Sequence, residues 1–374
     1  MTFSPTNPCH VEHRSSLRQG TMTKGIEELI AELLCTEARE SPLIGRYSEV
    51  EALVLPRNGQ FSVVMSAHDN QHRRRVILKV LSPSADAYRS ACFVREAKVS
   101  EALVGRDHII QLAGGIEKMT IPLAHPATGL IIPFPVQFFA LERARESFTA
   151  YLFGGSRPKP VFRRLELLRD VVKGVARLHR AGYCHRDLKP DNILIFSRGV
   201  AKVADLGTCR LLTGVDPISS SYVMPVGDLM YAAPEMFFAA GLDSKNFVAA
   251  DWFSVGAMIF EAITGQLLYV AIGLRNPMEI VRRLGAVADL KEFEKRVVGT
   301  AGRYPIPGTN EFSEPWLVPL SSGTHGAISS LVRDLCNFNY QSRLIDFDSI
   351  LRRLDAAIIR SRRDHFTHGR KGVV

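Results

Sequence analysis

Short apolar runs and helically spaced apolar positions divide this chain into two kinds of segment. Residues 74–81 and 138–141 are short runs rich in β-branched or aromatic residues, and such runs predict strands. Residues 165–179 and 251–265 place apolar side chains at helical spacing, which predicts helices. Beyond residue 44, predicted strands therefore dominate the first part of the chain and predicted helices the second.

The first 43 residues form a distinct segment. Residues 1–20 are polar and contain Pro and Ser, a composition typical of disorder. Residues 23–38 alternate acidic and apolar residues, which predicts an amphipathic helix that docks on a partner or, more simply, on its own domain. The apolar positions of this helix are Ile26, Leu29, Ile30, Leu33 and Leu34.

A second unusual segment runs from Thr120 to Val136. It contains four prolines and separates two predicted strands. We predict that this segment is a surface insertion between those strands.

An acid, a cation and an amide occupy fixed offsets in the octapeptide HRDLKPDN at residues 185–192. Phosphoryl transfer needs a carboxylate that accepts the proton of the attacking hydroxyl, a cation that offsets charge, and an oxygen that binds Mg²⁺. Asp187, Lys189 and Asn192 can fill these roles in that order. Asp205 follows Asp187 by eighteen residues, at the exit of a predicted hairpin, where its carboxylate can bind the same metal.

The octapeptide resembles the catalytic loop of eukaryotic-type (Hanks-type) serine/threonine protein kinases, and its Lys-Pro pair resembles the serine/threonine branch. Asp-Leu-Gly at 205–207 and Ala-Pro-Glu at 233–235 resemble two further motifs of that family in the same order. The resemblance implies an α+β, bilobal protein kinase-like fold, with a small β-rich N-lobe carrying one main helix and a larger, mainly helical C-lobe. The domains it implies are an N-terminal extension (1–43), an N-lobe (44–144), a C-lobe (145–358) and a basic C-terminal tail (359–374).

The same resemblance assigns roles in a reaction that uses ATP. Lys79 and Glu96 look like the strand lysine and helix glutamate whose ion pair positions the nucleotide phosphates. Asn192 and Asp205 are the expected ligands of Mg²⁺, with Mn²⁺ as an alternative ion. Asp187 is expected to orient the protein hydroxyl, and Lys189 to offset the charge that develops on the transferring phosphoryl group. The residues expected to bind ATP are Gly59, Phe61, Val64, Ile77, Lys79, Leu141, Glu142, Ala144 and Leu194, with Leu141 at the back of the adenine pocket.

Two pairings and one control point also follow from the resemblance. Asp251 resembles the buried aspartate that anchors the catalytic loop, and a helix cap is its simpler role. Arg343 matches the arginine that pairs with the glutamate of the Ala-Pro-Glu triplet, here Glu235. Arg186 resembles an arginine that captures a phosphate on the following segment. The candidate phosphate sites are Thr208, Thr213, Ser219, Ser220, Ser221 and Tyr222, and autophosphorylation is expected at Ser219, Ser220 and Ser221.

Three departures from the family pattern bear on activity. The phosphate loop at residues 56–64 keeps only Gly59 and Phe61, which weakens the close approach of backbone amides to phosphates. Ile77 replaces a small alanine and narrows the adenine pocket. Asp228 replaces a threonine, so it either pairs with Lys189, the preferred reading, or raises the pKa of Asp187 by like-charge repulsion.

Every group that touches the transferring phosphate is nevertheless present. The preferred function is therefore a serine/threonine protein kinase acting on protein substrates, including itself. The alternative is a pseudokinase that binds nucleotide or acts as a scaffold. A small-molecule kinase of the aminoglycoside type is disfavoured by the Lys-Pro pair and the Ala-Pro-Glu triplet.

Composition and charge limit the cellular location and the partners that we expect for this protein. The 374 residues are 46% hydrophobic, no membrane span is expected, and residues 1–20 lack the apolar core of a signal peptide. Six scattered cysteines without a CxxC pair suit free thiols in the cytoplasm, with Cys209 as either an inert side chain or a redox switch. The formal charge of +9 is concentrated near the C-terminus, where a solvated tail is the simplest reading and no nucleic-acid partner is expected.

Overall fold

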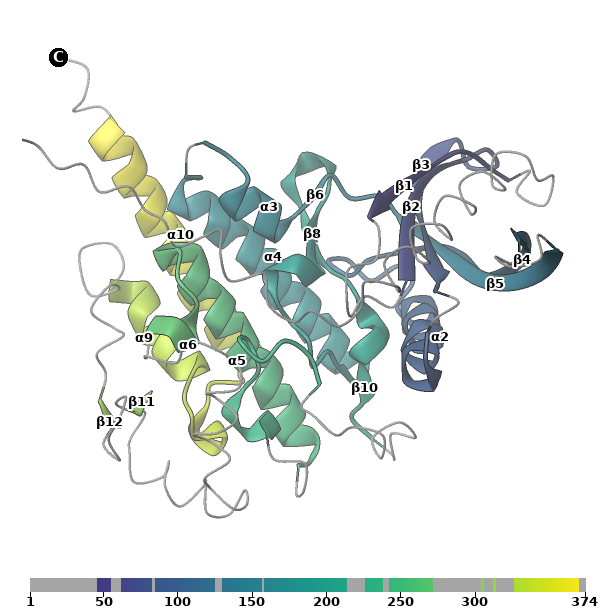
Figure 1. Ribbon diagram of the computed structural model, residues 1–374. Coiled ribbons are helices and arrows are strands. Elements are labelled where there is room, and N and C mark those ends of the chain that lie inside the picture. The colour runs from purple at the N-terminus through teal and green to yellow at the C-terminus, as the bar shows by residue number, and fades with distance from the viewer. Residues whose placement is uncertain are drawn as a thin grey trace, which may run out of the picture. The chain divides into compact units, whose positions relative to one another are not determined.

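The structure is a computed structural model, shown in Figure 1. It describes residues 46–54, 62–82, 85–124, 130–156, 158–213, 226–237, 242–271, 304–305, 312–313 and 326–369. These residues divide into two compact units. The first contains the described residues up to Ala85 together with Glu117–Phe138, and the second contains Asp86–Ile116 and the described residues from Phe139 onward. The predicted helix at 23–38 lies outside the described residues.

A five-stranded sheet forms most of the first unit. In β3, Val76, Leu78 and Val80 are at most 2% exposed and share one face, which leaves Ile77 and Lys79 on the other. The strand order is β1-β2-β3-β5-β4, and β2 pairs with β3 so that Val64 lies opposite Lys79. The strands are β1 (Tyr47–Val54), β2 (Ser62–Asp69), β3 (Arg74–Leu81), β4 (Leu112–Ala124) and β5 (Ile131–Glu142).

The predicted insertion at 120–136 is wrong for most of its length. Strand β4 continues to Ala124 and β5 begins at Ile131, so only residues 125–130 lie between them. Pro122 lies in β4, an edge strand, where a missing amide hydrogen costs little. Pro133 and Pro135 lie in β5, and the fixed φ of proline is compatible with extended backbone.

Helix α2 (Ala87–Ala102) belongs to the second unit, although the predicted N-lobe at 44–144 included it. Asp86 caps its first turn by accepting a hydrogen bond from the Arg89 amide at 2.7 Å. The helix packs against the short 3-10 helix η4 (Leu206–Thr208). A Cβ at Gly207 would lie 3.1 Å from the Cys92 carbonyl oxygen, so glycine is what permits this close approach.

The remainder of the second unit is mainly helical (Figure 1). Helix α4 packs against α5 and α10, and α9 packs against α5 and α10. A Cβ at Gly256 would lie 2.5 Å from Cys336 Sγ, so this glycine allows α5 to pack closely on the end of α9. The helices are α3 (Phe148–Phe153), α4 (Val161–Arg180), α5 (Ser244–Thr264), α6 (Leu268–Ala271), α9 (Gly326–Leu335) and α10 (Phe347–Gly369).

Helix α5 is the central apolar helix of this unit. An 18-residue window in it is apolar enough to cross a membrane, but 83% of that window is buried inside the protein. The sequence prediction overlooked this window, and packing against the other helices accounts for its composition. Asp243 caps the helix with a capping box, and Gly265 ends it in the left-handed conformation.

Short strands and turns complete the second unit. The predicted hairpin is confirmed, because β8 (Ile193–Ile195) pairs with β9 (Ala201–Val203) in antiparallel register. The predicted end of the C-lobe at residue 358 falls inside α10, which continues to Gly369. The other short elements are β6 (Glu146–Ser147), β7 (Tyr183–Cys184), β10 (Arg210–Leu211), β11 (Tyr304–Pro305), β12 (Phe312–Ser313), η2 (Pro190–Asn192), η3 (Ser197–Gly199), η6 (Pro234–Phe237) and η9 (Tyr340–Ser342).

The four described cysteines are buried free thiols. Burial raises the pKa of the Cys209 thiol well above its ordinary value, and it also raises the pKa of Cys184 to about 12. A thiol of this kind is a poor nucleophile, so the structure favours the inert reading of Cys209.

Candidate active site

Asp251 of α5 anchors the start of the octapeptide. Its carboxylate accepts hydrogen bonds from the backbone amides of His185 at 2.8 Å and Arg186 at 2.9 Å, and from His179 Nε2 at 2.8 Å. Burial favours the neutral acid, but the hydrogen bonds and the nearby histidines outweigh it, so the pKa of Asp251 is lowered. The predicted anchoring role is confirmed. The predicted capping role is wrong, because Asp251 lies inside α5 and the cap is Asp243.

Three donors hold the Asp187 carboxylate. Oδ1 accepts a hydrogen bond from the Asp228 amide at 2.8 Å. Oδ2 lies 3.1 Å from Asn192 Nδ2 and 3.2 Å from Lys189 Nζ. Asn192 Nδ2 also donates to the Asp187 carbonyl oxygen at 2.7 Å. The acid, cation and amide that the octapeptide predicted therefore meet around one carboxylate.

The charges around this carboxylate shift two pKa values. Burial raises the pKa of Asp187; the Lys189 ammonium opposes this shift and the Asp205 carboxylate adds to it. The net effect is a raised pKa, which makes Asp187 a stronger base than an ordinary aspartate. Burial lowers the pKa of Lys189, but Asp187 and Asp228 outweigh burial and the net shift is upward.

Asp205 follows β9 in a strained conformation. Its φ of 59° and ψ of 64° are left-handed, and Arg186 also has a positive φ of 70°. Non-glycine residues of this kind occur mainly where surrounding structure forces them, and they concentrate at active sites. The strain supports a functional role for the turn that Asp205 begins.

The donor set of this region fits Mg²⁺. Among the described residues, no group of three or more His, Cys, Asp or Glu side chains could hold a metal alone. Asn192 Nδ2 is committed to Asp187, which leaves the amide oxygen as the other polar atom of that side chain. A carboxylate and an amide oxygen are hard ligands, and Mg²⁺ is usually held by one or two carboxylates together with substrate phosphates. Asp205 and Asn192 can supply the protein part of such a site.

The predicted phosphate-positioning pair is divided between the units. Lys79 lies on β3 of the first unit, and Glu96 lies on α2 of the second, where it is 2% exposed. Their ion pair stays a prediction. Val64 and Ile77 lie on β2 and β3 of the first unit, whereas Gly59 and Phe61 lie outside the described residues.

The predicted adenine-contacting residues of the second unit lie near the end of β5 and on β8. Leu141 is buried, and Leu194 is half-buried on β8. The Glu142 carboxylate accepts hydrogen bonds from Lys202 Nζ at 2.6 and 2.8 Å and from the Gln111 amide at 2.8 Å. Sequence reasoning missed this role of Glu142, which links Gln111, the residue before β4, to Lys202 of β9. Ala144 lies two residues after the end of β5, and no hydrogen bond among the described residues uses its main-chain groups.

Arg186 is buried beside the strained turn. Its Nε donates to the Thr208 carbonyl oxygen at 2.7 Å, and the Thr208 hydroxyl donates to the His185 carbonyl oxygen at 2.9 Å. Because Thr208 is only 9% exposed, its hydroxyl is a poor phosphate acceptor. Thr213 is exposed, and the other candidate phosphate sites, Ser219, Ser220, Ser221 and Tyr222, lie outside the described residues.

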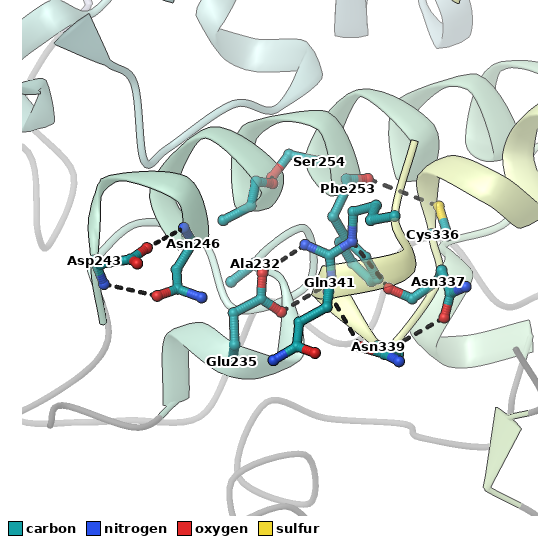
Figure 2. A network of polar contacts seen from close by, with 12 residues as sticks. Ala232, Glu235, Asp243, Asn246, Phe253, Ser254, Cys336, Asn337, Asn339 and Gln341 are labelled. Atoms are coloured by element: carbon teal, nitrogen blue, oxygen red, sulfur yellow. Dashed lines mark hydrogen bonds and ion pairs between the residues drawn. The ribbon is translucent and has the colours of Figure 1, made fainter. Parts of the chain in front are cut away.

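The predicted pair of Glu235 and Arg343 is confirmed and fully buried. Figure 2 shows Glu235 within the surrounding network of polar contacts. The Arg343 guanidinium donates to Glu235 Oε1 at 2.5 Å and to Oε2 at 2.9 Å, and both side chains are 0% exposed. Arg343 Nε also donates to the Asn337 carbonyl oxygen at 2.9 Å. The guanidinium lies over the Phe253 ring at 5.1 Å. This bidentate pair ties η6 to the segment after α9.

A further buried acid near the site was missed by sequence reasoning. The Tyr231 hydroxyl donates to Glu261 Oε2 at 2.6 Å, and Glu261 is 8% exposed on α5. Burial, with the nearby Asp191 and Asp228, raises the pKa of Glu261 to about 7. The available signal was an acid inside an otherwise apolar helix, ten residues after Asp251.

Comparisons with known proteins agree with this geometry. The family model described as "Protein kinase domain" matches residues 58–352. A "Probable cell division protein kinase" of Encephalitozoon cuniculi is 30% identical over 227 residues, which are 60% of this chain and 76% of that protein.

Two further relatives share smaller regions. The "Serine/threonine-protein kinase PknL" of Mycobacterium tuberculosis is 32% identical over 155 residues, or 40% of this chain and 37% of that protein. The "Rho-associated protein kinase let-502" of Caenorhabditis briggsae is 38% identical over 105 residues, or 28% of this chain and 9% of that protein. Most of the length of these two proteins therefore lies outside the match.

Proposed function

The chain belongs to the protein kinase family, and we propose that it transfers the γ-phosphoryl group of ATP to serine or threonine hydroxyls of proteins. The observation that carries this proposal is the arrangement around Asp187, whose carboxylate is held by Lys189, Asn192 and the Asp228 amide. A base fixed in this way can orient a hydroxyl for in-line attack. Its raised pKa favours acceptance of the hydroxyl proton.

The remaining residues of the site stabilise the charges of the nucleotide and of the transferring phosphoryl group. Lys189 offsets the charge that develops on the transferring group, and Lys79, paired with Glu96, contacts the phosphates of the nucleotide. Asn192 and Asp205 would hold Mg²⁺, which neutralises phosphate charge when bound. Leu141, Glu142, Ala144 and Leu194 surround the adenine together with Ile77 and Val64. Because phosphoryl transfer involves little covalent chemistry, positioning by these groups supplies most of the acceleration.

The proposed substrates are proteins, and the Lys-Pro pair at 189–190 favours serine or threonine as the acceptor. A relative that shares 155 residues with this chain carries the name of a serine/threonine kinase, which supports the same acceptor. Autophosphorylation at Ser219, Ser220 or Ser221 is part of the proposal, with Arg186 as the group that would pair with the phosphate.

The test is transfer of label from γ-labelled ATP with Mg²⁺, using the full chain and generic protein substrates such as casein and histone. We expect label on the wild type and a loss of about 10²–10⁴-fold in the Asp187→Asn variant, which keeps the side-chain volume but not the base. Phosphoamino-acid analysis of the product should give phosphoserine or phosphothreonine.

Two outcomes would replace the proposal. Thermal stabilisation by ATP and Mg²⁺ without transferred label would assign a nucleotide-binding pseudokinase. Absence of both signals would assign a scaffold. Equal labelling of wild type and Asp187→Asn would exclude Asp187 as the base.

A further inference from the structure

The Lys189 ammonium lies between two carboxylates. Its Nζ is 3.2 Å from Asp187 Oδ2 and 3.9 Å from Asp228 Oδ2. The Lys189 side chain is 22% exposed and that of Asp228 is 36% exposed, so neither group is fully hydrated. The resemblance to known kinases predicts a neutral hydroxyl where Asp228 stands, and the charge at this position is therefore a property of this chain.

The backbone of the Asp228 segment lies directly on the catalytic loop. Gly227 has a φ of 90°, and a Cβ there would lie 2.5 Å from the Arg186 carbonyl oxygen and 3.0 Å from Asp187 Oδ1. Only glycine fits this approach without a shift of the backbone. The approach allows the Asp228 amide to donate to Asp187 Oδ1 at 2.8 Å. This contact needs no particular side chain at position 228.

The two carboxylate oxygens of Asp228 have different roles. Oδ1 accepts a hydrogen bond from the Met230 amide at 3.0 Å, which stabilises the turn from Asp228 to Tyr231. Oδ2 is the atom that faces Lys189. An asparagine could replace the first role through its amide oxygen, but it could not replace the negative charge of the second. The turn and the charge can therefore be separated by substitution.

We propose that Asp228 is a positioning residue, whose carboxylate keeps the Lys189 ammonium in place when the Asp187 carboxylate turns to the substrate hydroxyl. In the structure Lys189 and Asn192 share Asp187 Oδ2. A hydroxyl that approaches this carboxylate competes with Lys189 for its lone pairs. A second anion within 4 Å holds the ammonium near the transferring phosphate during that exchange. The inference rests on the proposed kinase function.

The charges that face this pair are consistent with the role. Asp187, Asp228 and Asp205 all raise the pKa of Lys189 against the effect of burial. Asp187 in turn faces Lys189, Asp205 and His185. The Asp228 amide lowers the pKa of Asp187. The approach of Asp228 Oδ2 to within 3.9 Å of Lys189 Nζ favours pairing with Lys189 over repulsion of Asp187.

The experiment compares Asp228→Asn, which keeps the turn acceptor and removes the charge, with Asp228→Ala, which removes both, and Asp228→Glu, which keeps the charge. We expect Asp228→Asn to lower kcat about tenfold while KM for ATP changes less than about twofold. The alkaline limb of the kcat–pH profile should move to lower pH in Asp228→Asn, because Lys189 loses a carboxylate that raises its pKa, and Asp228→Glu should recover part of this shift.

A second measurement does not depend on catalysis. The side-chain ¹³Cε signal of Lys189, assigned with Lys189→Arg as the blank, reports the ammonium titration in the full chain. We expect the Lys189 pKa to fall by about half a unit to one unit in Asp228→Asn. If the wild type transfers no label but this pKa falls, the proposed function fails and the pairing of Asp228 with Lys189 stands.

Three results would overturn the inference. An unchanged kcat–pH profile and an unchanged Lys189 pKa in Asp228→Asn would show that the charge has no role. A defect confined to Asp228→Ala would reduce Asp228 to a turn former. A shift of the acid limb to lower pH in Asp228→Asn, with the alkaline limb unmoved, would mean that Asp228 repels Asp187 instead of holding Lys189.

Discussion

Asp251 and Asp187 are two aspartates of the same unit, and each is held by three donors. Asp251 accepts from two backbone amides and His179, and its pKa is lowered. Asp187 accepts from one backbone amide, Lys189 and Asn192, and its pKa is raised. The same number of donors therefore leads to opposite shifts.

The difference lies in the charges that surround each carboxylate. Asp251 faces His179 and His185, which favour its ionised form. Asp187 faces the Asp205 carboxylate, which disfavours ionisation in the same way as burial does. Asp251 therefore binds a proton less readily than an ordinary aspartate does, and Asp187 binds one more readily. The number of hydrogen bonds to a carboxylate does not by itself set the direction of its pKa shift.

The largest expected effect comes from the other buried anchor of this unit. Arg343→Ala leaves the Glu235 carboxylate buried without its partner, so the free energy of unfolding should fall by about 3–5 kcal/mol, as measured by urea denaturation. Arg353→Ala is the matched control, because its pair with Asp334 at 2.7 Å is partly exposed and should contribute less than about 1 kcal/mol.

If the free energy of unfolding fell by the same amount in Arg343→Ala and Arg353→Ala, the distinction between buried and surface ion pairs would be contradicted. In Arg343→Ala, a second change of Glu235 to Gln should recover part of the stability, because it removes the unpaired charge.

The second-largest effect is expected for substitution of Asp251, which is compared with the same substitution of Asp187. The Asp251 carboxylate accepts hydrogen bonds from His179 and from the His185 and Arg186 amides. Asp251→Asn removes the negative charge of this acceptor, so the free energy of unfolding should fall by about 2–3 kcal/mol. Kinase activity should fall in parallel, since the catalytic loop loses its anchor. Asp187→Asn should lower activity by about 10²–10⁴-fold with little loss of stability, because the charge that it removes is disfavoured by burial. If Asp251→Asn lost activity without losing stability, Asp251 would not differ from Asp187 as a structural anchor.

The smallest effect concerns the pH dependence of stability at Glu261. The pKa of Glu261 is raised to about 7, so the folded state binds a proton more tightly than the unfolded chain does. This contribution to stability is fully present below the ordinary carboxyl pKa near 4.5 and is lost as the pH rises to about 7. Glu261→Gln keeps an acceptor for the Tyr231 hydroxyl and cannot ionise.

Urea denaturation at pH 5 and pH 8 measures this contribution. From pH 5 to pH 8, the free energy of unfolding of the wild type should fall by roughly 1–3 kcal/mol more than that of Glu261→Gln. Glu146→Gln, at a half-buried position whose acid pairs with Arg145 on the surface, is the control and should follow the wild type. Identical pH dependence in wild type and Glu261→Gln would show that Glu261 is ionised in the folded state across this range.

Much of the fold followed from local sequence. The hairpin of β8 and β9, the buried strand at 138–141 and the long helix α4 were predicted from apolar spacing because burial on one face imposes that spacing. The prediction of an insertion at 120–136 was wrong because prolines were read as loop formers. The edge strand β4 tolerates Pro122, and the fixed φ of Pro133 and Pro135 is compatible with the extended backbone of β5. The true N-cap of α5, Asp243, was missed because Asp251 stood at the start of the more evident apolar run.

The sequence by itself determined the identity and spacing of the groups that make this a protein kinase: the acid, cation and amide of the octapeptide, the aspartate eighteen residues later, and the Glu235 and Arg343 pair. These groups can be recognised because phosphoryl transfer demands particular side-chain types at particular offsets. Tertiary structure alone decided which oxygen each donor holds, that the pKa of Asp251 is lowered and that of Asp187 raised, and that Glu261 lies beside Tyr231. The physical reason is that hydrogen bonds, burial and pKa shifts depend on segments far apart in the chain, whose distances no local pattern encodes.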